Sequence, residues 1–151
     1  MKPFKSCLVA GMLAVVAPAA LAESPEDFFY RYTELAASFD PAVAKLYDNS
    51  AKVRVFRIEA HKPQASLDLA GWQWKRHLAK AMPVARADGD ISEYRNIEVS
   101  RVARGYKIKA DRYSTLTCHT DRAYYMVISP NGRGSYAIAE EYTVVQADSA
   151  C

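Results

Sequence analysis

The fold of this chain is decided by residues 91–146, which read ISEYRNIEVSRVARGYKIKADRYSTLTCHTDRAYYMVISPNGRGSYAIAEEYTVVQ. The segment is rich in Tyr, Val, Ile and Thr, the residue types that favour strands. Turn-like separators divide it into four expected strands, at residues 91–102, 106–117, 123–129 and 135–146. Because the connections between them are short, the strands are predicted to form an antiparallel meander.

The first half of the chain is predicted to hold the helices. A first helix begins with Ser24 as its capping residue and ends near Asp40, because the residue before Pro41 disfavours helical backbone. Asp68 is expected to cap a second long helix, and Pro83 to end it. The other expected elements complete the order: a short helix at 41–47, a strand at 51–59 and a return strand at 65–67, before the second long helix at 69–82. Helices grouped apart from an antiparallel sheet indicate an α+β fold.

This order of elements resembles the superfamily of nuclear transport factor 2, ketosteroid isomerase and the SnoaL-like cyclases. The likeness covers residues 24–146, and it is clearest in the opening helix PEDFF at 25–29, the strand AKVRV at 51–55 and the strand SYAIA at 135–139. The resemblance implies a single domain, residues 23–151, shaped like a cone. In it, a strongly bent antiparallel sheet of about six strands carries three helices on its concave face, and a pocket lies at the wide end. Members range from isomerases and dehydratases to assembly domains, so the resemblance implies no one function.

Residues 1–22 read as a secretory signal peptide. Lys2 and Lys5 precede an apolar run from Leu8 to Leu21, and the segment closes with Ala-Leu-Ala at residues 20–22. The apolar run is too short for a stable membrane-spanning helix. Cys7 lacks the setting of a lipoprotein cleavage site, so no lipid anchor is expected. We predict an exported chain, periplasmic or extracellular, that begins at Glu23.

The two cysteines that remain after cleavage, Cys118 and Cys151, are predicted to form a disulfide, because an even pair in an oxidising compartment favours a bridge. The alternative is two free thiols. No cofactor is expected, and no metal site is predicted, since the three histidines show no ligand spacing.

The charge of the mature chain is close to neutral. The signal peptide contains two of the 20 Lys and Arg residues and none of the 17 acidic residues, so the mature chain has 18 basic and 17 acidic side chains, a net charge of +1. Such a chain has no electrostatic reason to bind nucleic acid or an anionic membrane. Neither is expected as a partner.

Candidate site residues come from the alternation of the expected strands. Arg112 on the strand at 106–117 and Glu140 on the last strand are predicted to face inward, where they could orient a polar ligand group or move a proton. The alternative is a structural ion pair, or two surface residues if a bulge shifts the alternation. Tyr136 and Tyr142 share the inward set with Glu140.

The helices contribute further candidates. Trp74 and His77 fall on the apolar face of the second long helix, and Tyr32 falls on that of the first. His77 is a second candidate base beside Glu140, although a histidine in such a place is more often a plain packing residue. The tyrosines on the strands are expected either to line an aromatic pocket or simply to pack the sheet.

Three functions are compatible with these patterns. The favoured hypothesis is an exported, non-enzymatic binding module that holds a small apolar ligand or docks a protein partner. The second is an isomerase, dehydratase or hydrolase that uses Glu140 or His77 as its base and a tyrosine as donor. The third is an assembly factor with a filled cavity and an exposed apolar patch. A homodimer through the outer face of the sheet is also expected, by resemblance.

Overall fold

The structure is a computed structural model, and it describes residues 22–59, 62, 64–147 and 151. The predicted signal peptide lies outside the described residues, except for Ala22. Within the part of the chain that the structure describes, no helix is long and apolar enough to cross a membrane.

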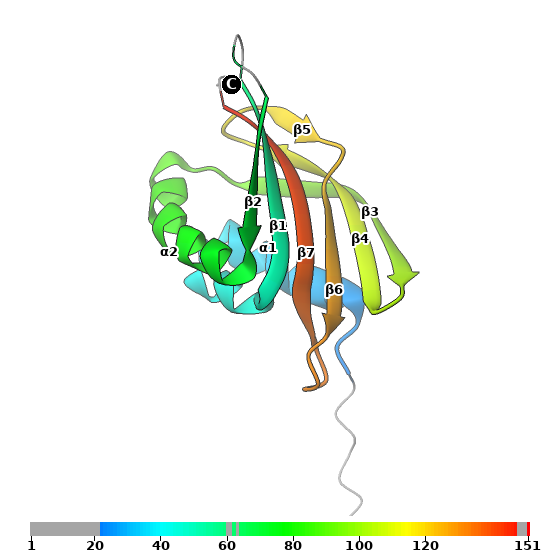
Figure 1. Ribbon diagram of the computed structural model, residues 1–151. Coiled ribbons are helices and arrows are strands. Elements are labelled where there is room, and N and C mark those ends of the chain that lie inside the picture. The colour runs from blue at the N-terminus through cyan, green and yellow to red at the C-terminus, as the bar shows by residue number, and fades with distance from the viewer. Residues whose placement is uncertain (1–21, 60–61, 63, 148–150) are drawn as a thin grey trace, which may run out of the picture.

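The chain has the predicted α+β architecture (Figure 1). Its helices are α1 (Pro25–Ala37), the 3-10 helix η1 (Pro41–Leu46) and α2 (Gly71–Asp88). Its strands are β1 (Tyr47–Ile58), β2 (Ala65–Ala70), β3 (Ser92–Val102), β4 (Gly105–Ser114), β5 (His119–Asp121), β6 (Tyr125–Pro130) and β7 (Tyr136–Gln146). The sheet has seven strands, one more than expected, because residues 119–121, predicted as a turn, form the short strand β5.

The strands form one curved sheet in the order β2-β1-β7-β6-β4-β3, with β5 paired to β4, and the helices lie on its concave side (Figure 1). One pairing differs from the antiparallel prediction: β1 and β7 are parallel. These two strands are joined by most of the chain, so no short hairpin forces them to be antiparallel. Register shifts at Asn96 in β3 and around Ala139 in β7 help the sheet to bend.

The helix α1 begins as the sequence predicts. The side chain of Ser24 accepts a hydrogen bond from the Asp27 backbone N–H at 3.0 Å, and Pro25 occupies the first turn. The helix ends at Ala37, three residues before the predicted end. The residues between the end of α1 and the start of η1 turn the chain, since Phe39 among them has a left-handed φ of 55°.

The helix α2 differs from the prediction at both ends. Asp68 pairs with Arg54 in the β1–β2 ladder, so Ala70 is the capping residue instead. Pro83 lies inside the helix, which continues to a left-handed Gly89. Pro83 and Ala79 are both exposed, so water can solvate the Ala79 carbonyl group that the proline leaves without a partner.

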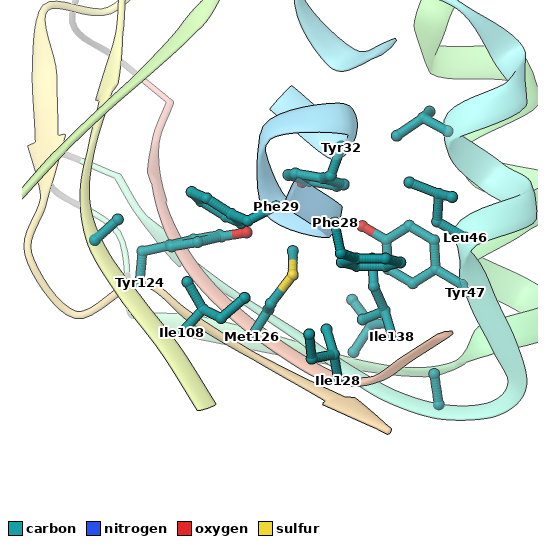
Figure 2. Close-up of a cluster of buried hydrophobic side chains, with 14 of the residues drawn as sticks. Phe28, Phe29, Tyr32, Leu46, Tyr47, Ile108, Tyr124, Met126, Ile128 and Ile138 are labelled. Atoms are coloured by element: carbon teal, nitrogen blue, oxygen red, sulfur yellow. The ribbon is translucent and has the colours of Figure 1, made fainter. Parts of the chain in front are cut away.

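The hydrophobic core fills the narrow end of the cone, between α1 and the sheet. Figure 2 shows Phe28 of α1 packed against side chains of the sheet, and Phe28, Ile108, Met126, Ile128 and Ile138 are all fully buried. The ring of Tyr136 meets Phe28 edge to face, with 6.0 Å between the ring centroids. This packing positions α1 and leaves its other end to border the wide end of the cone.

The predicted disulfide is present. Cys118 and Cys151 are bonded, with 5.3 Å between their Cα atoms. The bridge closes a loop of 33 residues, and in the chain-entropy model it stabilises the fold by about 3–4 kcal/mol. It ties the C-terminal residue to the connection between β4 and β5.

Phe28→Ala is expected to lower the free energy of unfolding by about 3–5 kcal/mol, because it removes a fully buried ring and leaves a cavity. Tyr30→Ala on the same helix is the control: Tyr30 is 65% exposed, so its effect should stay near 0.5 kcal/mol, as is usual for surface sites. Urea unfolding measures both, and equal losses would contradict this description of the core.

Candidate functional site

A cavity of about 600 Å³ lies between the helices and the concave face of the sheet, at the wide end of the cone. Its size is that of a small-molecule site. Most of its wall is apolar or aromatic, with contributions from the helices and five strands. The residues that matter below are Tyr32, Tyr47, Val55, Arg57, Trp74, His77, Leu78, Met82, Tyr94, Arg112, Tyr124, Glu141, Thr143 and Val145.

The floor of the cavity is built around one buried carboxylate, Glu141 of β7, which is 3% exposed. It accepts a hydrogen bond from each of three tyrosine hydroxyls: Tyr32 at 3.0 Å, Tyr47 at 2.5 Å and Tyr124 at 2.9 Å. Hydrogen bonds to an ionised acceptor are roughly twice as strong as neutral ones. The cluster therefore supplies the solvation that burial removes from Glu141.

Burial raises the pKa of the Tyr32, Tyr47 and Tyr124 hydroxyls well above their ordinary value, and the nearby charge of Glu141 raises it further. The three groups are thus held in the protonated state, in which each can donate to Glu141. In this state the carboxylate is an acceptor with few lone pairs left, so it is poorly placed to take a proton from a ligand.

Arg112 of β4 is the arginine deep in the cavity wall. Its Nη1 donates to Thr143 Oγ1 at 3.2 Å, and Thr143 is in turn held by the buried Asp121. Burial alone lowers the pKa of Arg112, but the acidic groups around it, Tyr94 and Glu141 among them, raise the pKa by more. The guanidinium group therefore stays charged at the cavity wall.

The Tyr94 hydroxyl lies beside Arg112. Burial raises the pKa of Tyr94, whereas the positive charge of Arg112 lowers it in part. The ring of Tyr94 packs edge to face on Phe29 and Tyr124, with 5.3 Å between ring centroids in each case. Tyr94 is thus a rigid wall residue whose polar end reaches the cation.

The other wall of the cavity is formed by α2. Trp74 and His77 are stacked, with 5.0 Å between ring centroids and 17° between planes. His77 is exposed and borders the mouth. Within the described residues, Trp74 Nε1 is the one buried side-chain polar atom that lacks a hydrogen-bond partner.

The structure places only some of the predicted site residues around this cavity. Tyr32, Trp74, His77 and Arg112 line it. The other three, Tyr136, Glu140 and Tyr142, do not. Tyr136 is part of the packing at the narrow end, against Phe28 and Tyr106.

Glu140 and Tyr142 lie on the opposite, convex face of the sheet, which corrects the predicted inward placement. Glu140 accepts a hydrogen bond from Tyr125 at 2.6 Å, and Tyr125 stacks on Tyr142. The cause is a β-bulge: Val127 pairs with Glu140 while Ile128 pairs with Ile138, so Ala139 is an extra residue. Before the bulge the even-numbered residues face inward, and after it the odd-numbered ones do.

Sequence reasoning missed Tyr47 and Glu141, and it gave Tyr94 and Tyr124 only as strand tyrosines that either line a pocket or pack the sheet. The consecutive acids Glu140 and Glu141 in mid-strand were the available signal, since strict alternation forces one of the two to face inward. Which one does so depends on the bulge, and no glycine or proline marks that bulge in the sequence.

Among the described residues, no group of three or more His, Cys, Asp or Glu side chains is placed to hold a metal ion. The charged side chains that line the cavity are Arg57, Arg112, Asp90 and Glu141, and His77 and several hydroxyls add further polar groups. This set can orient a polar group of an otherwise apolar molecule.

Solved structures share this architecture across four fifths of the chain. A nuclear transport factor 2-like protein of unknown function from Pseudomonas putida KT2440 matches with a TM-score of 0.60 and 11% identity, over 82% of this chain and 84% of that one. The chain has the nuclear transport factor 2-like fold. A candidate ketosteroid isomerase from Parabacteroides distasonis ATCC 8503 matches with a TM-score of 0.55 and 15% identity, over 82% and 89% of the two chains.

A candidate dehydratase of the same fold, from Streptomyces avermitilis, matches with a TM-score of 0.54 and 13% identity, over 83% of this chain and 96% of that one. No protein-family model and no curated protein matches the chain. At these identities the comparisons establish the nuclear transport factor 2-like fold, and the site has to be argued from its own residues.

Glu141→Gln is expected to lower the free energy of unfolding by about 2–4 kcal/mol, because the amide loses the charge that strengthens three buried hydrogen bonds. Glu140→Gln is a matched control one residue away: on the convex face its effect should stay below about 1 kcal/mol. Chemical denaturation measures the two variants. A larger loss for Glu140→Gln would show that the register of β7 described here is wrong.

The tyrosine cluster also predicts alkaline sensitivity. The pKa values of Tyr32, Tyr47 and Tyr124 are raised in the folded state above the value of about 10 of an unfolded chain, and Tyr125 is raised to about 12. The folded state therefore binds these protons more tightly. The stability that this provides is complete below pH 10 and is lost as the pH rises toward the folded pKa values.

The expected result is a falling urea midpoint above about pH 10, with the absorbance of the buried tyrosinates near 295 nm appearing only as the protein unfolds. Tyr47→Phe should make the fall shallower, because one of the linked protons is gone. A midpoint that is constant to about pH 11 would contradict the burial of these hydroxyls.

Proposed function

We propose that this protein is a non-enzymatic binding module that holds a small, largely apolar ligand in the cone cavity. The observation that carries the proposal is the cavity itself: about 600 Å³ at the wide end is bordered by side chains such as Val55, Leu78 and Met82 and is not filled by them. Such cavities, apolar with a few convergent polar groups, are the usual form of ligand sites.

The polar groups of the cavity favour binding over proton transfer. Glu141, the buried carboxylate, is engaged by three tyrosines, and Glu140 lies on the convex face away from the cavity. Arg112 is a donor at the cavity wall, which suits the recognition of a ligand acceptor. A cavity of this volume also favours a small ligand over the assembly-factor hypothesis, which called for a filled cavity.

One observation favours a second candidate function, proton-transfer catalysis. His77 borders the cavity mouth and is held by its stack on Trp74, so its imidazole can reach a bound molecule. The test uses 2-tetralone, a ketone with acidic C–H bonds, in D₂O followed by NMR. Catalysed deuterium uptake that His77→Asn abolishes would support an isomerase-type activity, and uptake at the rate of buffer alone would exclude it for this class.

Export is part of the proposal. It is supported by the predicted signal peptide and by the contacts of Glu23, whose carboxylate pairs with Arg31 at 2.8 Å and accepts a hydrogen bond from Ser135. A chain that begins at Glu23 keeps these contacts. Intact mass of the protein recovered from the periplasm of an expressing bacterium is expected to match residues 23–151 with one disulfide, and a mass that includes residues 1–22 would reject cleavage.

The convex face of the sheet is the proposed surface of a homodimer. Tyr125 and Tyr142 stack there, and Lys107 Nζ lies 3.8 Å from the centroid of the Tyr125 ring. Aromatic side chains of this kind are enriched at interfaces. Sedimentation equilibrium is expected to give a dimer that Tyr142→Glu dissociates, and a monomer at all concentrations would remove this part of the proposal.

The binding proposal predicts a cavity-dependent thermal shift. Neutral bicyclic probes such as 2-naphthol should raise the Tm of the mature protein, because they bind only the folded state. Ala81→Phe places a ring in the cavity and should abolish the shift, whereas Ala79→Phe, on the exposed side of the same helix, should retain it. A shift that is equal in the two variants would place binding elsewhere.

A further inference from the structure

The guanidinium group of Arg112 has donors that the protein does not use. A guanidinium group carries five N–H donors. Thr143 accepts from Nη1, and the hydroxyl of Tyr94 lies beside the group. Among the residues the structure describes, no carboxylate forms an ion pair with Arg112 within 4.0 Å. In the same residues, Trp74 Nε1 is the one enclosed side-chain polar atom without a hydrogen-bond partner, so no nitrogen of Arg112 is both enclosed and without a partner. The remaining N–H groups of Arg112 are therefore not enclosed by protein, and they border the cavity.

Glu141 does not take the place of a direct partner for Arg112. Its two oxygens already accept from Tyr32, Tyr47 and Tyr124, which satisfies three of about four lone-pair positions. Its charge acts on Arg112 through space and helps to keep the guanidinium group protonated. The cavity thus offers a cation that is stabilised at a distance but lacks a contact anion.

We propose that the ligand is an amphiphilic carboxylic acid, whose carboxylate binds Arg112 and whose apolar body occupies the space between α2 and β7. This inference rests on the proposed binding function and names its ligand class. A planar guanidinium group matches a carboxylate with two parallel hydrogen bonds, a geometry that lysine cannot offer. Leu78 and Met82 on one side and Val145 on the other provide the apolar walls.

Arg57, the arginine at the mouth of the cavity, does not account for a preference for carboxylic acids. Arg57 also borders the cavity, but it already pairs with Glu59 at 2.6 Å and its side chain is 57% exposed. An exposed ion pair of this kind contributes little to binding and is screened by salt. Arg112 and Arg57 are therefore a matched pair, one half-buried and without a contact anion, the other exposed and paired.

The test compares 2-naphthoic acid with methyl 2-naphthoate by isothermal titration calorimetry on the oxidised mature protein. The acid is expected to bind at least about tenfold more tightly than the ester, the size of one charge-assisted hydrogen bond. Equal affinities, or a tighter ester, would overturn the inference and leave the proposed binding function standing. If neither compound binds and neutral probes give no thermal shift, the binding function itself fails.

Variants of Arg112 and Arg57 show which of the two arginines causes the preference for the acid over the ester. Arg112→Gln should reduce the affinity for the acid to that for the ester, and Arg112→Lys should fall between, because it keeps the charge and loses the two-point contact. Arg57→Gln should retain the full preference for the acid. A preference that is lost in Arg57→Gln and kept in Arg112→Gln would place the carboxylate at the mouth and overturn the inference. If Arg112→Gln does not fold, the comparison of acid and ester on the unaltered protein decides.

Discussion

The structure depends on the hydrogen bonds that gather three tyrosine hydroxyls around the buried carboxylate of Glu141. Tyr32 comes from α1, Tyr47 from the start of β1 and Tyr124 from the residue before β6, so the cluster joins segments that are up to 109 residues apart in the chain. An ionised group that is removed from water must be solvated by the protein, or it destabilises the fold by several kcal/mol. This requirement positions α1 against the sheet and closes the floor of the cavity.

The β-bulge at Ala139 is the local feature that makes this arrangement attainable. Before the bulge, Tyr136 and Ile138 pack in the core at the narrow end. After it, Glu141, Thr143 and Val145 face the cavity. Without the extra residue, Glu140 would point at the tyrosines and Glu141 at solvent. A single inserted residue thus divides β7 into a half that packs the core and a half that faces the cavity.

Glu141 and Arg112, two of the charged groups of the cavity, have different roles because their surroundings differ. Glu141 is satisfied by protein donors, whereas Arg112 is held in place by Thr143 and keeps donors directed at the cavity. Solved structures of the same fold are described as candidate isomerases and dehydratases at 13–15% identity, and this chain shares their shape. The assignment of carboxylate, cation and hydroxyls to separate roles belongs to this chain's own side chains.

The sequence by itself determined the α+β class, the order of the elements apart from the short β5, the start of α1 and the disulfide, because caps, alternation and cysteine pairing are local or countable properties. It also predicted the inward direction of Arg112, which follows from unbroken alternation along β4. It did not determine the continuation of α2 through Pro83, which depends on the exposure of that side of the helix. Nor did it determine the parallel pairing of β1 with β7 or the choice of Glu141 over Glu140. Tertiary structure decided these, because each depends on which distant segment lies opposite a residue, and a one-residue shift in that pairing reverses the face of every side chain that follows.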